Sequence, residues 1–119
     1  MIMRKVTLVL LTLFPLLSVA KMSDAEWGLI SSSINQELRE MGLSNKALSC
    51  RIFNHSNPSI LVYEYSGSLL DDQNAFMMAS KFKSDFAKNL TTEERRVFKK
   101  GGYKFIQFKV KNKTTNLTL

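Results

Sequence analysis

The first twenty residues constrain the fold of this chain most, because they have the composition of an export signal rather than of a packed segment. A short basic start leads into an apolar run, Val6–Val19. Small residues at Ser18–Ala20 match the positions that a signal peptidase reads, and Lys21 follows them. The sequence therefore predicts a cleavable signal peptide over residues 1–20 and a single domain over residues 21–119.

An uncleaved membrane anchor is the competing interpretation of the apolar run. The run is shorter than the roughly 20 apolar residues that a membrane span needs, which favours a cleaved signal. The chain has a single cysteine, Cys50, which excludes an internal disulfide. Small secreted eukaryotic domains are usually rich in paired cysteines. We therefore expect a bacterial protein that is periplasmic or secreted. Glycans would require a eukaryotic secretory route, and chance explains the four sequons, which begin at Asn54, Asn89, Asn112 and Asn116.

The first predicted helix has clear signals at both ends. Ser23 and Glu26 have the spacing of a capping box, in which each side chain bonds the other residue's backbone N–H. Apolar residues then recur at spacings of three and four, which is typical of one buried helix face. Gly42 is well placed as a left-handed stop, and Leu43 can pack back on the helix. The pattern predicts a helix from Asp24 to Met41.

The remaining segments alternate between strand and helix patterns. Two strand-like runs, Ala47–Phe53 and Ser59–Tyr65, flank a stretch of turn-forming residues and predict a β-hairpin. Asp71 and Asp72 suit the first turn of a second helix, whose apolar stripe extends to Leu90. Thr91 and Glu94 form a second capping box, so a further helical segment is expected at residues 91–100. A strand at residues 103–110 and a short partner strand at residues 114–119 then follow.

This order predicts one small α+β domain with an antiparallel sheet of three or four strands and the helices packed on one face. The elements follow as helix, strand, strand, helix, strand and a last strand. Apolar residues lie on both faces of the runs at 59–65 and 103–110. They indicate that the second face of the sheet is also partly buried, and a homodimer through that face is a side prediction.

The residues with catalytic chemistry are few and widely spaced. Cys50 alternates with core positions, so a buried structural thiol is favoured over a reactive thiol or an intermolecular disulfide. His55 lies in the turn, and the strand would hold it about 16 Å from Cys50. One His and one Cys fall short of the four ligands of a structural zinc site. We therefore expect no enzymatic activity, no metal and no cofactor.

Charge is concentrated in the last third of the sequence. The full chain has a net charge of +7, and residues 81–119 alone have eleven basic and three acidic residues. The simplest explanation of this basic region is a solvated face that keeps the protein soluble. The more specific explanation is that the region binds polyanions or an acidic protein. An exported protein meets little nucleic acid, so we do not expect nucleic acid as a partner. The candidate binding residues, which alternate with aromatic residues, are Arg95, Arg96, Lys99, Lys100, Lys104 and Lys109.

The leading functional hypothesis is a small exported, non-catalytic protein that binds another envelope or secreted protein as an accessory, an inhibitor or an immunity-type protein. The alternative is a binder of anionic lipid or polysaccharide surfaces through the C-terminal basic cluster.

Overall fold

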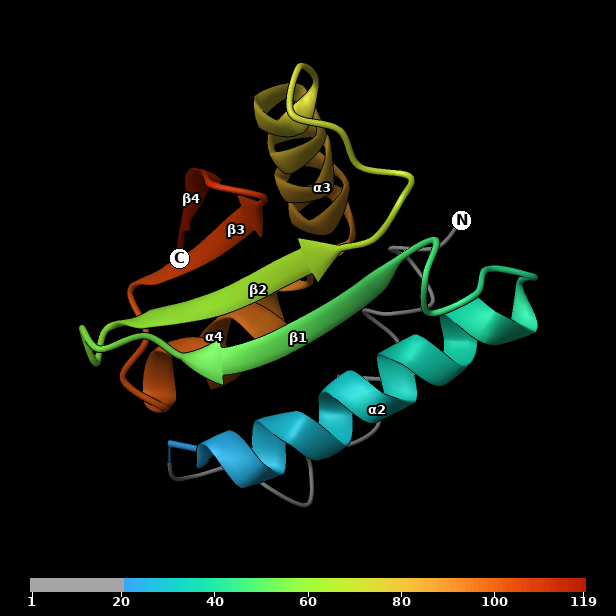
Figure 1. Ribbon diagram of the computed structural model, residues 1–119. Coiled ribbons are helices and arrows are strands. Elements are labelled where there is room, and N and C mark those ends of the chain that lie inside the picture. The colour runs from blue at the N-terminus through green and yellow to red at the C-terminus, as the bar shows by residue number, and fades with distance from the viewer. Residues whose placement is uncertain (1–20) are drawn as a thin grey trace.

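The computed structural model describes residues 21–119, so the predicted signal peptide lies outside the described residues. Three helices and four strands make up this part of the chain (Figure 1). None of these helices is both long enough and apolar enough to cross a membrane. In chain order the elements are α2 (Asp24–Glu40), β1 (Ser49–Asn54), β2 (Ile60–Ser66), α3 (Ala75–Asn89), α4 (Thr92–Lys100), β3 (Phe105–Val110) and β4 (Lys113–Thr118).

The sheet is mixed, with the strand order β1-β2-β3-β4. Its two outer pairs, β1 with β2 and β3 with β4, are antiparallel hairpins, as the sequence predicts. The central pair is parallel, with Ile60 opposite Phe105 and Tyr65 opposite Val110. The prediction of an antiparallel sheet is therefore wrong for this pair, although the α+β class is confirmed.

The parallel pairing follows from the path of the chain between β2 and β3. The helices α3 and α4 lie between these strands in the chain and form the crossover that a parallel pair needs. The backbone N–H groups of Lys104 and Phe105 donate to the carbonyl of Ser59, at 2.7 and 3.1 Å. The chain thus enters β3 beside the start of β2 and has to run in the same direction. Strand periodicity carries no information about this direction.

Both capping boxes are present. The Ser23 hydroxyl accepts from the Glu26 N–H at 3.2 Å, and the Glu26 carboxylate accepts from the Ser23 N–H at 2.9 Å. At the other end of α2 the Leu43 N–H donates to the Leu38 carbonyl at 3.0 Å, and Gly42 has a φ of 89°. This is the expected Schellman ending, for which glycine has no steric penalty. The second box, formed by Thr91 with Glu94, begins α4.

The start of α3 differs from the expectation. The helix begins at Ala75, so Asp71 and Asp72 lie before it and not in its first turn. The Asp71 carboxylate instead accepts from the Asn74 N–H at 2.8 Å, and this bond lowers the pKa of the carboxyl. A short Asp side chain satisfies a turn N–H in the way that it would satisfy a helix N–H. The sequence signal is therefore the same in the two cases.

The core lies between the sheet and the helices, with α4 behind β1 and β2 and α2 alongside β1 in Figure 1. Trp27 of α2 stacks on Phe98 of α4 with a centroid separation of 6.3 Å. Phe86 of α3 contacts Tyr63 and Phe108 of the sheet, at 5.3 and 5.4 Å. One aromatic cluster therefore joins the sheet to all three helices. The other face of the sheet points away from the helices.

Candidate functional site

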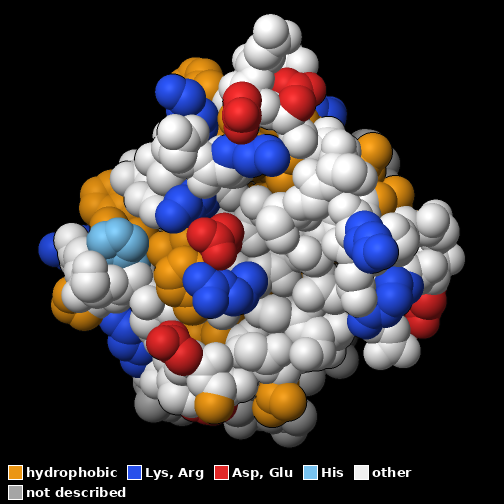
Figure 2. Space-filling view, in the orientation of Figure 1, with side chains coloured by type: hydrophobic (Ala, Val, Ile, Leu, Met, Phe, Trp, Pro, Cys, Tyr) orange, Lys and Arg blue, Asp and Glu red, His pale blue; other side chains and the backbone are white. Residues whose placement is uncertain are grey.

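The face of the sheet that points away from the helices carries an apolar strip. We call it the open face, and its strip consists of Phe53, Ile60, Val62 and Phe105. Neighbouring side chains cover Val62, which is only 1% exposed, and the other three are half-buried. In the view of Figure 2 hydrophobic side chains lie beside basic and acidic groups over β1 and β2. The expectation that the second face of the sheet is partly buried is confirmed.

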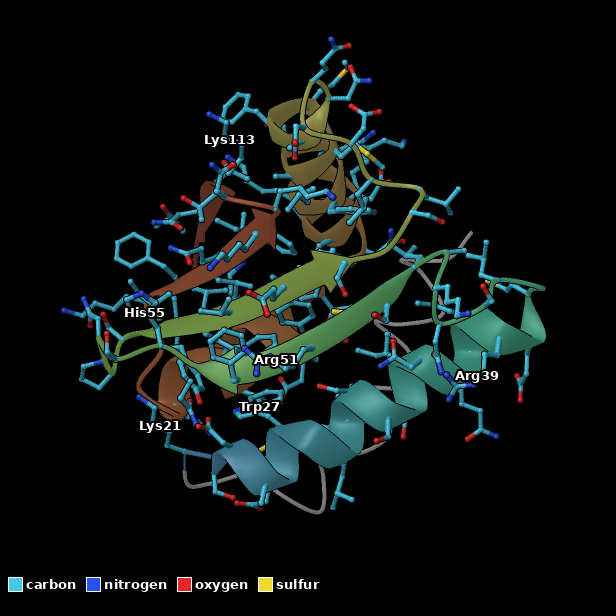
Figure 3. All side chains as sticks on the ribbon, viewed as in Figure 1. Lys21, Trp27, Arg39, Arg51, His55 and Lys113 are labelled. Carbon is cyan, nitrogen blue, oxygen red and sulfur yellow. The ribbon has the colours of Figure 1, made fainter. Side chains whose placement is uncertain are left out.

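A charged row crosses the open face next to this strip. Strand register places Arg51, Glu64 and Lys109 side by side on three strands. The Glu64 carboxylate lies between the two cations, 3.2 Å from the Arg51 guanidinium and 3.5 Å from the Lys109 ammonium. The Arg51 guanidinium also lies over the Phe53 ring, 4.3 Å from its centroid. Figure 3 shows Arg51 in front of the sheet, on the side away from Trp27.

Sequence reasoning selected Lys109 in this row but missed its neighbours. Arg51 and Glu64 each alternate with core residues of a predicted strand, which places them on the outward face. Pairing the two strands of the predicted hairpin would have brought Arg51 and Glu64 together. The contact with Lys109 depends on the parallel pairing of β2 with β3, which the sequence does not reveal.

The predicted basic cluster does not form one surface. Arg95 donates to the Thr118 carbonyl at 2.9 Å, and Arg96 pairs with Glu93 at 2.8 Å. Lys99 and Lys104 line a shallow groove of about 450 Å³, together with aromatic and apolar side chains near the end of β4. Lys100 is exposed on the last turn of α4, and Lys109 belongs to the open face. The structure thus brings Lys99 and Lys104 together and separates them from Lys109.

Most of the aromatic residues that alternate with these basic residues belong to the core. Phe98, Tyr103 and Phe108 are at most 3% exposed, and only Phe105 is half-buried. Stacking of nucleobases requires exposed ring faces. Three of the four rings therefore have no face to offer a nucleic acid.

Cys50 and His55 have structural surroundings. Cys50 is 3% exposed, and burial raises the pKa of its thiol to about 12 despite a hydrogen bond with Tyr65. The Nδ1 atom of His55 accepts from the Asn57 N–H at 2.9 Å within the hairpin turn. The buried position of Cys50 agrees with the favoured interpretation of a structural thiol.

The beginning of the described chain is attached to the same turn. The Lys21 ammonium donates to the Pro58 carbonyl and lies 4.7 Å from the centroid of the Tyr103 ring. In Figure 3 Lys21 and His55 lie near this end of the sheet, far from Arg39. The turn is therefore held between the first residues of the domain and β3.

No group of three or more His, Cys, Asp or Glu side chains that could hold a metal ion occurs within residues 21–119. Comparison of the chain with known families, with curated proteins and with solved structures finds no match in any of the three. The surfaces described above are therefore the basis of the functional proposal.

Proposed function

We propose that this chain is a small exported, non-enzymatic domain that binds another envelope or secreted protein through the open face of its sheet. The observation that carries the proposal is the apolar strip of the open face, bordered by the Arg51–Glu64–Lys109 row. Apolar patches with a polar border are typical of protein–protein contacts. An accessory, an inhibitor and an immunity-type protein all fit this description.

Arg51 and Phe53 are the residues that we expect to contribute most to binding. Arginine and aromatic side chains are enriched among the residues that dominate interface energies. Arg51 already lies over the Phe53 ring, so part of its side-chain entropy is lost before a partner arrives. The pair therefore presents a partly preorganised contact.

A capture experiment tests this proposal. The protein, purified after export, is immobilised and incubated with an envelope extract at low and high salt, and captured proteins are identified and then purified for affinity measurement. Replacing both Phe53 and Phe105 by alanine should weaken the affinity at least tenfold. The matched control is Phe76→Ala, since Phe76 is a 58% exposed aromatic on α3, away from the open face. Equal affinities of the double variant and the wild type would refute the role of the open face.

A specific observation also supports the alternative function. Residues 95–119 contain eight basic and no acidic residues, and Lys99 and Lys104 share one groove. This region would attract anionic lipid or polysaccharide. Binding to phosphatidylglycerol vesicles, but not to phosphatidylcholine vesicles, should then fall steeply with salt. It should also be lost when Arg95, Arg96, Lys99 and Lys100 are all replaced by alanine, and unchanged binding would eliminate this function.

A further inference from the structure

The edge of the sheet formed by β1 is closed by side chains of α2. The N–H and the carbonyl of Cys50 both bond the Asn35 amide, at 2.9 and 3.0 Å. The Ile52 N–H donates to the Ser31 hydroxyl at 2.8 Å, and the Asn54 N–H donates to the Asp24 carboxylate at 2.8 Å. These four groups include all three N–H groups of β1 that point away from β2. The helix thus takes the place of a neighbouring strand.

The other edge, formed by β4, is not closed in this way. The Leu119 N–H bonds the Lys104 carbonyl, and the Arg95 guanidinium bonds the Thr118 carbonyl from outside. Alternation along an antiparallel strand then directs the backbone groups of Thr114 and Asn116 outward as well. Within residues 21–119 these outward groups have no hydrogen-bond partner, and both side chains are exposed. β4 therefore offers a free template for another strand.

Positively charged side chains lie at both ends of this free edge. Lys113 begins β4, and Lys104 and Lys99 lie at its other end. None of these three lysines has an ion-pair partner within the described part of the chain. Figure 3 shows Lys113 at the β3–β4 turn, far from His55 at the β1–β2 turn. The two ends of β4 are about 17 Å apart, from the rise per residue of a strand.

We propose that the free edge of β4 binds an extended acidic segment of the partner protein, which adds to the sheet as a fifth strand. Its backbone pairs with the outward groups of Thr114 and Asn116, and its carboxylates approach Lys113 at one end and Lys99 and Lys104 at the other. Strand addition supplies affinity through main-chain bonds, and the flanking charges select the segment. This inference rests on the proposed function, because it names the chemistry of the protein that is bound.

The test uses the exported protein and a fluorescein-labelled peptide, Glu-Glu-Thr-Val-Thr-Glu-Glu, with binding followed by anisotropy. A second peptide of the same sequence, N-methylated at alternate residues, retains the charges but lacks the N–H donors on one edge, and the two N-methylation registers are tried separately. One of the two registers should bind at least tenfold more weakly than the parent peptide, the size expected for the loss of a main-chain hydrogen bond. This comparison leaves the protein unchanged, so it does not depend on the folding of a variant.

A pair of variants places the contact on β4. Asn116→Pro removes an outward N–H, which an edge strand tolerates, and should weaken binding about tenfold. Asn116→Ser keeps the N–H and should stay within twofold of the wild type. On addition of the parent peptide, amide hydrogen exchange at Asn116 should slow in the wild-type protein. Replacing Lys99 and Lys104 by glutamine should weaken binding severalfold at low salt.

Four results would overturn the proposal. Equal affinity of the parent peptide and both N-methylated peptides would show attraction by charge alone. Absence of binding at millimolar peptide would show that the edge accepts no such segment. A wild-type dimer that Asn116→Pro converts to a monomer would identify a second copy of the chain as the occupant. Capture of a partner that depends on Phe53 and Phe105 but not on Asn116 would leave the proposed function intact while this inference fails.

Discussion

Two buried tyrosine hydroxyl groups illustrate how much one polar atom contributes at the residue scale. The Tyr103 hydroxyl accepts from the Trp27 indole N–H at 3.0 Å and donates to the Asn54 side chain. The Tyr63 hydroxyl is buried and has no hydrogen-bond partner among the described residues. A buried hydroxyl without a partner costs free energy, whereas removing a bonded one leaves its partners unsatisfied.

We therefore predict opposite effects for two identical substitutions. Tyr63→Phe should raise the free energy of unfolding by up to about 1 kcal/mol, because it removes an unsatisfied group. Tyr103→Phe should lower it by about 1–2 kcal/mol, because the Trp27 N–H loses its acceptor. Urea unfolding of both variants measures these changes. Destabilisation by Tyr63→Phe would mean that the hydroxyl has a partner in solution.

Because of the buried Cys50 thiol, we expect the stability of the domain to fall at alkaline pH. Burial raises the pKa of the thiol to about 12 in the folded protein, above its usual value of 9.0. The stabilising contribution of the neutral thiol is therefore complete below pH 9 and is lost as the pH rises toward 12. Burial raises the pKa values of Tyr63 and Tyr65 in the same direction.

The prediction is a fall in the free energy of unfolding between pH 8 and pH 10.5, measured by urea denaturation. Cys50→Ala should show a smaller fall over this interval, because it lacks the titrating thiol, although the tyrosines still contribute. At pH 8 the folded wild type should resist a thiol reagent such as dithionitrobenzoate, and the urea-unfolded protein should react fully. Rapid reaction of the folded protein would contradict the buried position of Cys50.

At the scale of elements, side chains of α2 bond the backbone of β1. The Asn35 amide bonds both the N–H and the carbonyl of Cys50, as the backbone of a neighbouring strand would. Ser31 links the two elements a second time, accepting from Ile52 and donating to the Trp27 carbonyl. The three outward N–H groups of β1 and the Cys50 carbonyl are thereby paired, as buried backbone groups generally are.

Replacement of Asn35 by alanine should therefore lower the free energy of unfolding by about 2 kcal/mol, since an N–H and a carbonyl lose their partner. The matched control is Ser33→Ala on the same helix. Among the described residues the Ser33 hydroxyl bonds only the Leu29 carbonyl, one turn earlier, so a change within about 0.5 kcal/mol is expected. Thermal and urea unfolding of both variants give the comparison. Equal effects of the two substitutions would show that Asn35 does not stabilise the β1 edge.

Element prediction succeeds where the signal is local. Ser23 with Glu26, Thr91 with Glu94 and the stop at Gly42 act over three or four residues, and all three signals are confirmed. Asp71 shows the limit of such signals, because a turn and a helix start use its carboxylate in the same way. The bounds of the strands are correct to within one or two residues at each end.

At the scale of the whole molecule, the folded domain should be independent of the first twenty residues. One aromatic cluster joins all three helices to the sheet, so residues 21–119 share one core. Single domains of this size usually unfold in one cooperative step. We predict that protein recovered after export from a bacterial host begins at Lys21, as intact-mass spectrometry will show, and unfolds in a single transition. A mass that includes residues 1–20 would contradict cleavage.

The sequence by itself determined the features that depend on neighbours in the chain. Helix caps, the alternation of strands, the α+β class and the concentration of basic residues near the C-terminus all follow from residues close together. The sequence predicts only part of the candidate surfaces. It indicates Lys99 and Lys104 as binding residues, and these two share a groove, but it does not indicate Arg51, Phe53 or Glu64.

Only the tertiary structure decided the direction of β3, the separation of Lys109 from Lys99, and which edge of the sheet remains free. Each depends on contacts between segments more than ten residues apart, such as Ser59 with Lys104 and Asn35 with Cys50. A strand has the same alternation in either direction, and its two edges carry the same backbone groups. The packing of α2 against β1 and of the α3–α4 crossover against the sheet distinguishes them, because packing alone determines which groups are paired and which face solvent.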